Sequence, residues 1–137
     1  MNYKKEVYKG MELLNKHPRT IFIGQAVEYK GTALTHQVKN FIILAMNQIV
    51  NHLDKWEAMS VGESKPKVIM KAIVGSEYPL DPGHQHKANY TECLRSACTN
   101  IDVVEILYPH QVLPAYERAL NSERSVIIVE HGDLYNL

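Results

Sequence analysis

The stretch NFIILAMNQIVNHLDKWEAMSVGESKPKVIMKAIVG, residues 40–75, decides the fold of this chain. Its first half carries apolar residues three, four and seven positions apart, so one face of a helix is apolar for about four turns. These residues are Ile42, Ala45, Met46, Ile49, Leu53 and Trp56. Gly62 and Pro66 end the helical pattern, and residues 67–74 are a β-rich run. A long buried helix that leads into a central strand is typical of a layered α/β domain.

Strands and helices alternate along the rest of the sequence. We predict strands at residues 20–24, 67–74, 102–107 and 125–130, which are short apolar or alternating runs. We predict helices for an amphipathic N-terminal segment that His17–Pro18 stops and for residues 90–99 and 110–121. This order requires a three-layer α/β domain, residues 1–137, with a mostly parallel sheet of about four strands and flanking helices.

Charge and hydropathy exclude several classes of protein. Fifteen basic residues balance fifteen acidic ones, and no basic stripe is interleaved with aromatic residues, so we expect no nucleic-acid partner. The N-terminus lacks the continuous apolar run of a signal peptide, and no later run reaches the length of a membrane span. We therefore expect a cytoplasmic protein without a membrane partner.

The two cysteines, Cys93 and Cys98, are five residues apart in a predicted helix and so lie on different faces of it. We predict that they are reduced, packed and inert. The alternative is a reactive thiol, which needs a cationic neighbour such as Arg95.

Polar residues follow the predicted strands, at the edge of a parallel sheet where α/β domains bind ligands. They are Gln25, Glu28, His84, His86, Tyr108, His110, His131 and Asp133. No Cys or carboxylate joins His84 and His86 at a metal-ligand spacing, so we predict no metal there. No nucleophile elbow, phosphate-binding glycine loop or HExxH pattern is present, so these motifs indicate no enzyme class.

Four stretches, in order, resemble one protein family. They are HPRTIFIGQAVEYKG (17–31), NFIILAMNQIVNHLDKWEAMS (40–60), VIMKAIVG through the GHQH loop (68–86), and IDVVEILYP through VIIVEHGDLY (101–135). Together they resemble the pyrimidine-binding domain of the beta subunit of thiamin diphosphate-dependent 2-oxo acid dehydrogenases, in the transketolase-like group. The resemblance implies that thiamin diphosphate would lie between this domain and a diphosphate-binding domain on a partner alpha subunit, so the isolated chain is not expected to hold it.

The sequence departs from the family where the family activates its cofactor. The resemblance implies a glutamate that hydrogen-bonds the aminopyrimidine ring, but the two strand–helix units that include it are missing between Lys39 and Asn40. We interpret this gap as an internal deletion. Glu28 is the nearest acid and does not match the activating residue, while Gln25 stands where the family has a glutamate after the first strand.

Some positions of the family's site are retained. His86, in the pattern G-x-Q-H, matches a histidine that faces the family's active site and is our candidate catalytic residue. Phe41 matches an aromatic residue of the pyrimidine pocket, although an aromatic residue on an apolar helix can equally be part of the core. The candidate cofactor-binding residues are Phe41, Gln25 and Glu28.

The resemblance also implies a structural monovalent-cation site just before the last strand. Ser122 and Arg124 stand where the family has an Asp and an Asn. Because a guanidinium would repel a cation, we predict no metal at this position.

Two functions are compatible with these observations. The loss of two strand–helix units would leave apolar surface to be covered, which favours a non-catalytic module that forms a homo-oligomer or docks onto a partner. The alternative is half of a thiamin diphosphate enzyme acting on a 2-oxo acid, completed by an alpha-subunit-like chain. A small-molecule sensor that uses the loop of His84 and His86 is a third and weaker hypothesis.

Overall fold

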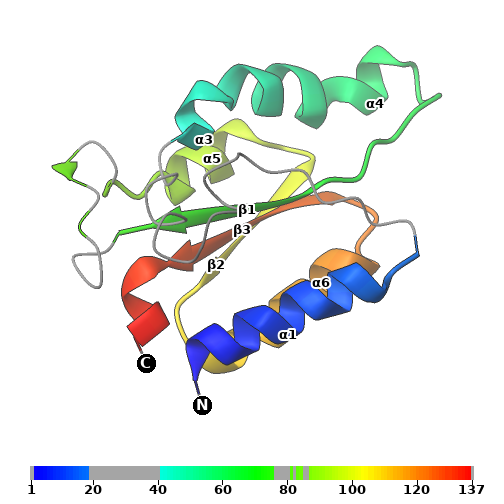
Figure 1. The fold of residues 1–137 in the computed structure, drawn as a ribbon. Coiled ribbons are helices and arrows are strands. Elements are labelled where there is room, and N and C mark those ends of the chain that lie inside the picture. Colours follow the sequence, from blue (N-terminus) through cyan, green and yellow to red (C-terminus); the bar gives the residue numbers. More distant parts are fainter. Residues whose placement is uncertain (1, 19–40, 76–80, 82, 85–86, 137) are drawn as a thin grey trace.

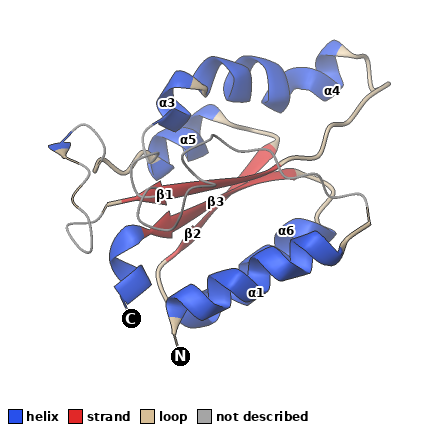
Figure 2. Cartoon of the chain, viewed as in Figure 1, coloured by secondary structure: helices blue, strands red, loops and turns tan. Residues whose placement is uncertain are grey.

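The computed structural model describes residues 2–18, 41–75, 81, 83, 84 and 87–136 (Figure 1). Within these residues the chain folds into three layers around a three-stranded parallel sheet (Figure 2). The strands are β1 (Ile69–Val74), β2 (Ile101–Ile106) and β3 (Ser125–His131), in the order β1-β3-β2. The predicted α/β class and parallel sheet are therefore confirmed, while the strand predicted at residues 20–24 lies outside the described residues.

The central strand, β3, is almost entirely buried because both faces of the sheet are covered. It pairs with β1 from Ile69↔Val126 to Val74↔His131 and with β2 from Ile101↔Ser125 to Ile106↔Glu130. Its run of β-branched residues is the pattern of a parallel strand that is buried on both faces. The predicted strand bounds are correct to within two residues.

One face of the sheet is covered by α1 (Tyr3–Lys16) and α6 (Val112–Asn121), which lie side by side (Figure 1). The Asn2 side chain caps α1 by accepting a hydrogen bond from the backbone N–H of Lys5, at 3.1 Å. The two helices approach closely at Gly10, where an added Cβ would lie 2.7 Å from the ring of Tyr116. A larger residue at this position would require the Tyr116 ring to shift.

The other face is covered by α5 (Thr91–Ala97) and by the long helical segment of residues 41–59 (Figure 2). That segment consists of α3 (Phe41–Leu44), the π-helical η3 (Asn47–His52), the 3₁₀ turn η4 (Leu53–Lys55) and α4 (Trp56–Met59). Ile49 is buried, and the partly buried side chains packed beside it include Ile42, Ala45, Met46 and Leu53. The predicted apolar face is therefore confirmed over its first three turns.

Trp56 was predicted on the buried face, but its side chain is 41% exposed, so that part of the prediction is wrong. A π-helical turn is wider than an α-helical turn and shifts the phase of every residue that follows it, including Trp56.

The prediction that both cysteines are packed is wrong for Cys93, which is exposed, whereas Cys98 is buried as expected. Two short 3₁₀ elements, η6 (Pro109–Gln111) and η7 (Gly132–Asn136), follow β2 and β3.

None of the helices in the described ranges has both the length and the apolar composition needed to cross a membrane.

Candidate functional site: the carboxyl edge of the sheet

Two polar clusters lie at the carboxyl ends of the strands, on opposite faces of the sheet. Because side chains alternate along a strand, the consecutive residues Glu130 and His131 point to opposite faces. Glu130 faces α1 and α6, and His131 faces the layer that contains α5. Ligands of parallel α/β domains bind at this edge, so both clusters are candidates for a site.

The first cluster joins His131 to Glu105 of β2. The Nε2 atom of His131 lies 2.7 Å from Oε1 of Glu105, and the Asn89 side-chain amide donates to the same oxygen at 2.8 Å. Arg95 of α5 places Nη1 3.9 Å from Oε2 of Glu105 and also pairs with Glu92. The Glu105 carboxylate is therefore held from both sides.

The Asn89 side chain connects this cluster to the start of α5. Its Oδ1 accepts hydrogen bonds from the backbone N–H and the hydroxyl of Thr91, while its amide donates to Glu105. Burial alone would raise the pKa of Glu105, but the hydrogen bonds from Asn89 and His131 and the charge of Arg95 lower it below its usual value. Glu105 is thus an ionised carboxylate at neutral pH.

The second cluster surrounds Glu130, whose side chain is fully buried. The Tyr116 hydroxyl donates to Oε1 at 2.7 Å, the Tyr135 hydroxyl donates to Oε2, and the Lys71 ammonium lies 3.2 Å from Oε2. The buried Tyr3 hydroxyl has no hydrogen-bond partner in the described structure. Burial and the nearby charge of Glu130 raise the pKa values of all three tyrosines, so the phenols stay neutral. The hydrogen bonds from Tyr116 and Tyr135 to Glu130 attach α6 and η7 to the sheet.

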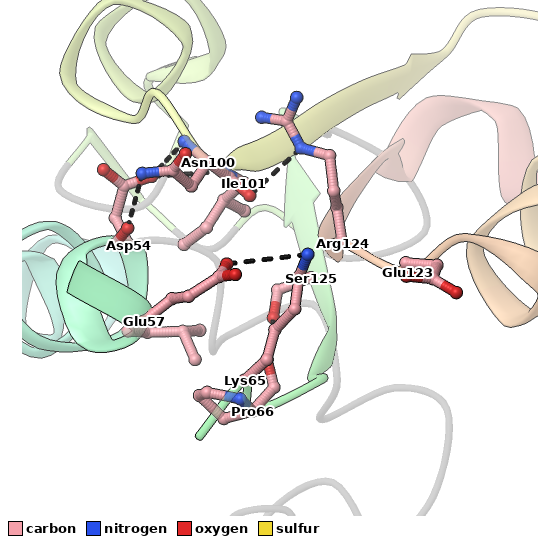
Figure 3. A pocket seen from close by; sticks show the side chains of 10 residues that line it. Asp54, Glu57, Lys65, Pro66, Asn100, Ile101, Glu123, Arg124 and Ser125 are labelled. Atoms are coloured by element: carbon pink, nitrogen blue, oxygen red, sulfur yellow. Dashed lines mark hydrogen bonds and ion pairs between the residues drawn. The ribbon is translucent and has the colours of Figure 1, made fainter. Parts of the chain in front are cut away.

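The opposite, amino edge of the sheet is closed by a second buried acid, Asp54 (Figure 3). Its carboxylate accepts hydrogen bonds from the backbone N–H groups of Thr99, Asn100 and Ile101 at 2.9, 2.6 and 3.1 Å, and from the Thr99 hydroxyl at 3.0 Å. The helical segment 41–59 is thereby fixed to the start of β2. The hollow beside Asp54 measures about 20 Å³, about the space that one water molecule needs.

Arg124 binds the carbonyl side of the same backbone segment. Its guanidinium donates to the carbonyl oxygens of Thr99 at 2.7 Å and Asn100 at 3.1 Å, and it pairs with Asp102 at 3.1 Å. The positive charge of Arg124 therefore lies directly against the carbonyl oxygen atoms of this loop. The absence of a cation here stays a prediction.

The structure describes only some of the predicted site residues. Gln25, Glu28 and His86 lie outside the described residues, and for Phe41 only the backbone, at the start of α3, is described. His110 and Tyr108 stack on each other, with ring centroids 5.7 Å apart. Among the described residues, no group of three or more His, Cys, Asp or Glu side chains is placed to hold a metal ion.

Glu105, Asn89 and Arg95 were not predicted as site residues, because they come from a strand, a loop and a helix that the sequence does not place together. A signal existed for Glu105, which is an acidic residue in the middle of the strand pattern IDVVEI. A charged residue within a strand covered on both faces needs a partner, and here that partner is His131.

The fold and this edge define a parallel α/β domain with polar clusters at the carboxyl ends of its strands. A sequence comparison connects the chain to a particular kind of enzyme subunit. The chain is 26% identical over 120 residues to the pyruvate dehydrogenase E1 component subunit beta of Chlorokybus atmophyticus. The match covers 85% of this chain but only 35% of that relative. No family model matches the sequence. The chain is therefore distantly similar to a 2-oxo acid dehydrogenase beta subunit and spans about a third of it.

Proposed function

We propose that the chain is a shortened relative of the 2-oxo acid dehydrogenase beta subunit that acts as an oligomerising or partner-docking module without thiamin diphosphate chemistry of its own. Its distant similarity to a beta subunit supports the ancestry. The gap between Lys39 and Asn40, where the family's activating glutamate is missing, supports the loss of cofactor activation.

The observation that carries the docking role is the exposed apolar surface at the two ends of the helical segment 41–59. Leu44 in α3 is 78% exposed, Met59 in α4 is 60% exposed, and Val61 just after α4 is 89% exposed. Trp56 adds a partly exposed aromatic ring near the second end. Apolar side chains gathered in an exposed patch mark surfaces that another protein covers, and Trp56, Met59 and Val61 come from one short stretch of the chain.

The backbone at Val61 supports the same proposal. This residue has a φ of +54°, a conformation that is unfavourable for a β-branched side chain and that glycine or asparagine adopts more easily. An apolar, β-branched side chain that is both strained and exposed contributes little to the stability of the isolated chain. A contact with a second protein would bury the Val61 side chain and so give it a role in binding.

Sedimentation velocity of the purified chain tests the docking role. We expect a homo-oligomer that Leu44→Asp or Met59→Asp converts to monomer, because each change places a charge on the apolar surface. Asn51→Asp is the matched control, since it adds the same charge to the polar middle of the helical segment, where Asn51 bonds Asn47 and Lys55. Oligomers that persist in both apolar-to-charged variants would contradict the proposed surface.

The second candidate function is half of a thiamin diphosphate enzyme completed by an alpha-subunit-like chain. It is favoured by the name of the relative, a subunit of pyruvate dehydrogenase, and by the two retained residues Phe41 and His86. Mixing the chain with an alpha-type protein, thiamin diphosphate and magnesium and then measuring consumption of a 2-oxo acid separates the two functions. Turnover in that mixture would replace the non-catalytic role by the enzymatic one.

A further inference from the structure

His131 and Glu105 are arranged as a base and its orienting carboxylate. Nε2 of His131 lies 2.7 Å from Oε1 of Glu105, and in a neutral imidazole that donates Nε2–H to this carboxylate, Nδ1 is the acceptor nitrogen. No other side-chain hydrogen bond to the His131 ring is formed within the described residues, and the side chain is 26% exposed. A neutral imidazole with one ring nitrogen held by a carboxylate presents its other nitrogen as a proton acceptor.

The carboxylate in this pair has supporting residues of its own. Asn89 donates to the same oxygen as His131 at 2.8 Å, and Arg95 lies near the other oxygen. Glu105 is 16% exposed and ionised at neutral pH, since its pKa is lowered. An ionised carboxylate in this position stabilises the imidazolium that forms when Nδ1 takes a proton, which is how a base gains strength from a third group.

The alternative explanation is that the His131–Glu105 pair only joins β2 to β3. The sheet does not need the pair for this purpose. The backbone ladder already joins β2 to β3 from Ile101↔Ser125 to Ile106↔Glu130. His131 lies one residue beyond the last of these pairs, at the carboxyl edge of the central strand. The pair therefore adds no strand contact that the ladder lacks, and it stands where parallel α/β domains bind ligands.

We propose that His131, oriented by Glu105, is a general base for a small-molecule ligand that binds at the carboxyl edge of the sheet and presents a hydroxyl group or another weakly acidic hydrogen. In the reaction step, the O–H bond of the ligand or of a bound water breaks, and its proton goes to Nδ1 of His131. The electron pair stays on the oxygen, which becomes the nucleophile. This role goes beyond the docking function and does not depend on it.

Hydrolysis of p-nitrophenyl acetate by the full chain tests the proposal. His131 takes a proton from water, the water oxygen bonds to the ester carbonyl carbon, and the bond to p-nitrophenolate breaks, releasing acetate and a coloured anion. We expect His131→Asn and Glu105→Gln each to lower the protein-catalysed rate at least tenfold, which is below the ~10²–10⁴-fold effect of a base on its own substrate. His52→Asn, which alters an exposed histidine of the helical segment 41–59, should leave the rate unchanged.

A rate that survives either the His131 or the Glu105 substitution, or a wild-type chain that hydrolyses the ester no faster than the buffer, would overturn the proposal. A measurement on the unmodified chain guards against variants that fail to fold. Nitrogen-15 NMR of the imidazole groups should show that the neutral form of His131 carries its hydrogen on Nε2 and none on Nδ1. A hydrogen on Nδ1 instead would leave that atom unable to accept a proton and would overturn the proposal.

Discussion

Asp54 is the residue at which a single change should most clearly loosen the fold. The Asp54→Asn substitution keeps the shape of the side chain but replaces a charged acceptor by a neutral amide. The carboxylate accepts four hydrogen bonds from Thr99, Asn100 and Ile101. The change therefore weakens the attachment of the helical segment 41–59 to the start of β2.

The magnitude follows from the strength of these bonds. A hydrogen bond to a charged group contributes about 1.5–3 kcal/mol, against about 0.5–1.5 kcal/mol for a neutral pair. Because the four bonds share one carboxylate, their contributions do not add, and we expect Asp54→Asn to lower the free energy of unfolding by about 2 kcal/mol. Asp54→Ala leaves the backbone N–H groups without an acceptor and should cost about 3–4 kcal/mol.

The effect should depend on pH in a defined direction. Burial alone would raise the pKa of Asp54, but the hydrogen bonds from Asn100, Thr99 and Ile101 outweigh burial and lower it below its ordinary value. A carboxyl group whose pKa is lowered in the folded state contributes stability above its unfolded pKa, about 3.9. That contribution is lost as the pH falls through the lower, folded value.

Urea denaturation followed by circular dichroism at pH 7 and pH 3 measures both effects. The gap between the wild-type chain and Asp54→Asn should be largest at pH 7 and smaller at pH 3. Asp102→Asn is the control, because its ion pair with Arg124 is nearly half exposed and is expected to contribute only about 0–1 kcal/mol. Equal midpoints for the wild-type chain and Asp54→Asn at pH 7, or a gap that does not shrink at pH 3, would refute the reasoning.

Three further substitutions test other contacts by the same measurement. Gly10→Ala should lower stability by about 1 kcal/mol, since overpacking against the Tyr116 ring outweighs the better helix propensity of alanine; a gain in stability would show that the ring can move. Glu130→Gln should lower it by about 3 kcal/mol, because Lys71 and Tyr116 lose the charge of their buried partner. An unchanged midpoint would contradict this. Arg124→Lys should cost about 1 kcal/mol, because an ammonium cannot reproduce the planar contacts of a guanidinium, and a neutral result would show that those contacts contribute nothing.

A matched variant in the same helix serves as the control for Gly10→Ala. Glu12→Ala changes an exposed position of the same helix, α1, and raises helix propensity slightly without touching Tyr116. It should leave stability within about 0.5 kcal/mol of the wild type.

The parts of the fold that depend on local periodicity could be predicted from the sequence. The continuous apolar run of β3 and the spacing of Ile42, Ala45, Met46 and Ile49 each determine which face is buried, because burial follows from residue spacing alone. The exposure of Trp56 could not be predicted, because the π-helical turn before it changes that spacing. No composition or propensity signal marks such a turn.

The candidate site was less accessible to sequence reasoning, because its contacts join residues far apart in the chain. His131 was predicted as a polar residue at a strand exit. Glu105 and Asn89 lie beside it only because β2 pairs with β3 and because Asn89 is hydrogen-bonded to Thr91 at the start of α5. The residues carried over from the family resemblance, Gln25, Glu28 and His86, stay predictions, as does the internal deletion. Measurements of cofactor binding and activity are needed to test these predictions.

The measurement that tests the central claim most directly is a calorimetric titration of the purified chain with thiamin diphosphate and magnesium. The internal deletion that we propose between Lys39 and Asn40 leads us to expect no heat of binding above dilution for the chain alone. Saturable binding of thiamin diphosphate by the isolated chain, accompanied by turnover of a 2-oxo acid, would contradict the account and identify the chain as an enzyme in its own right.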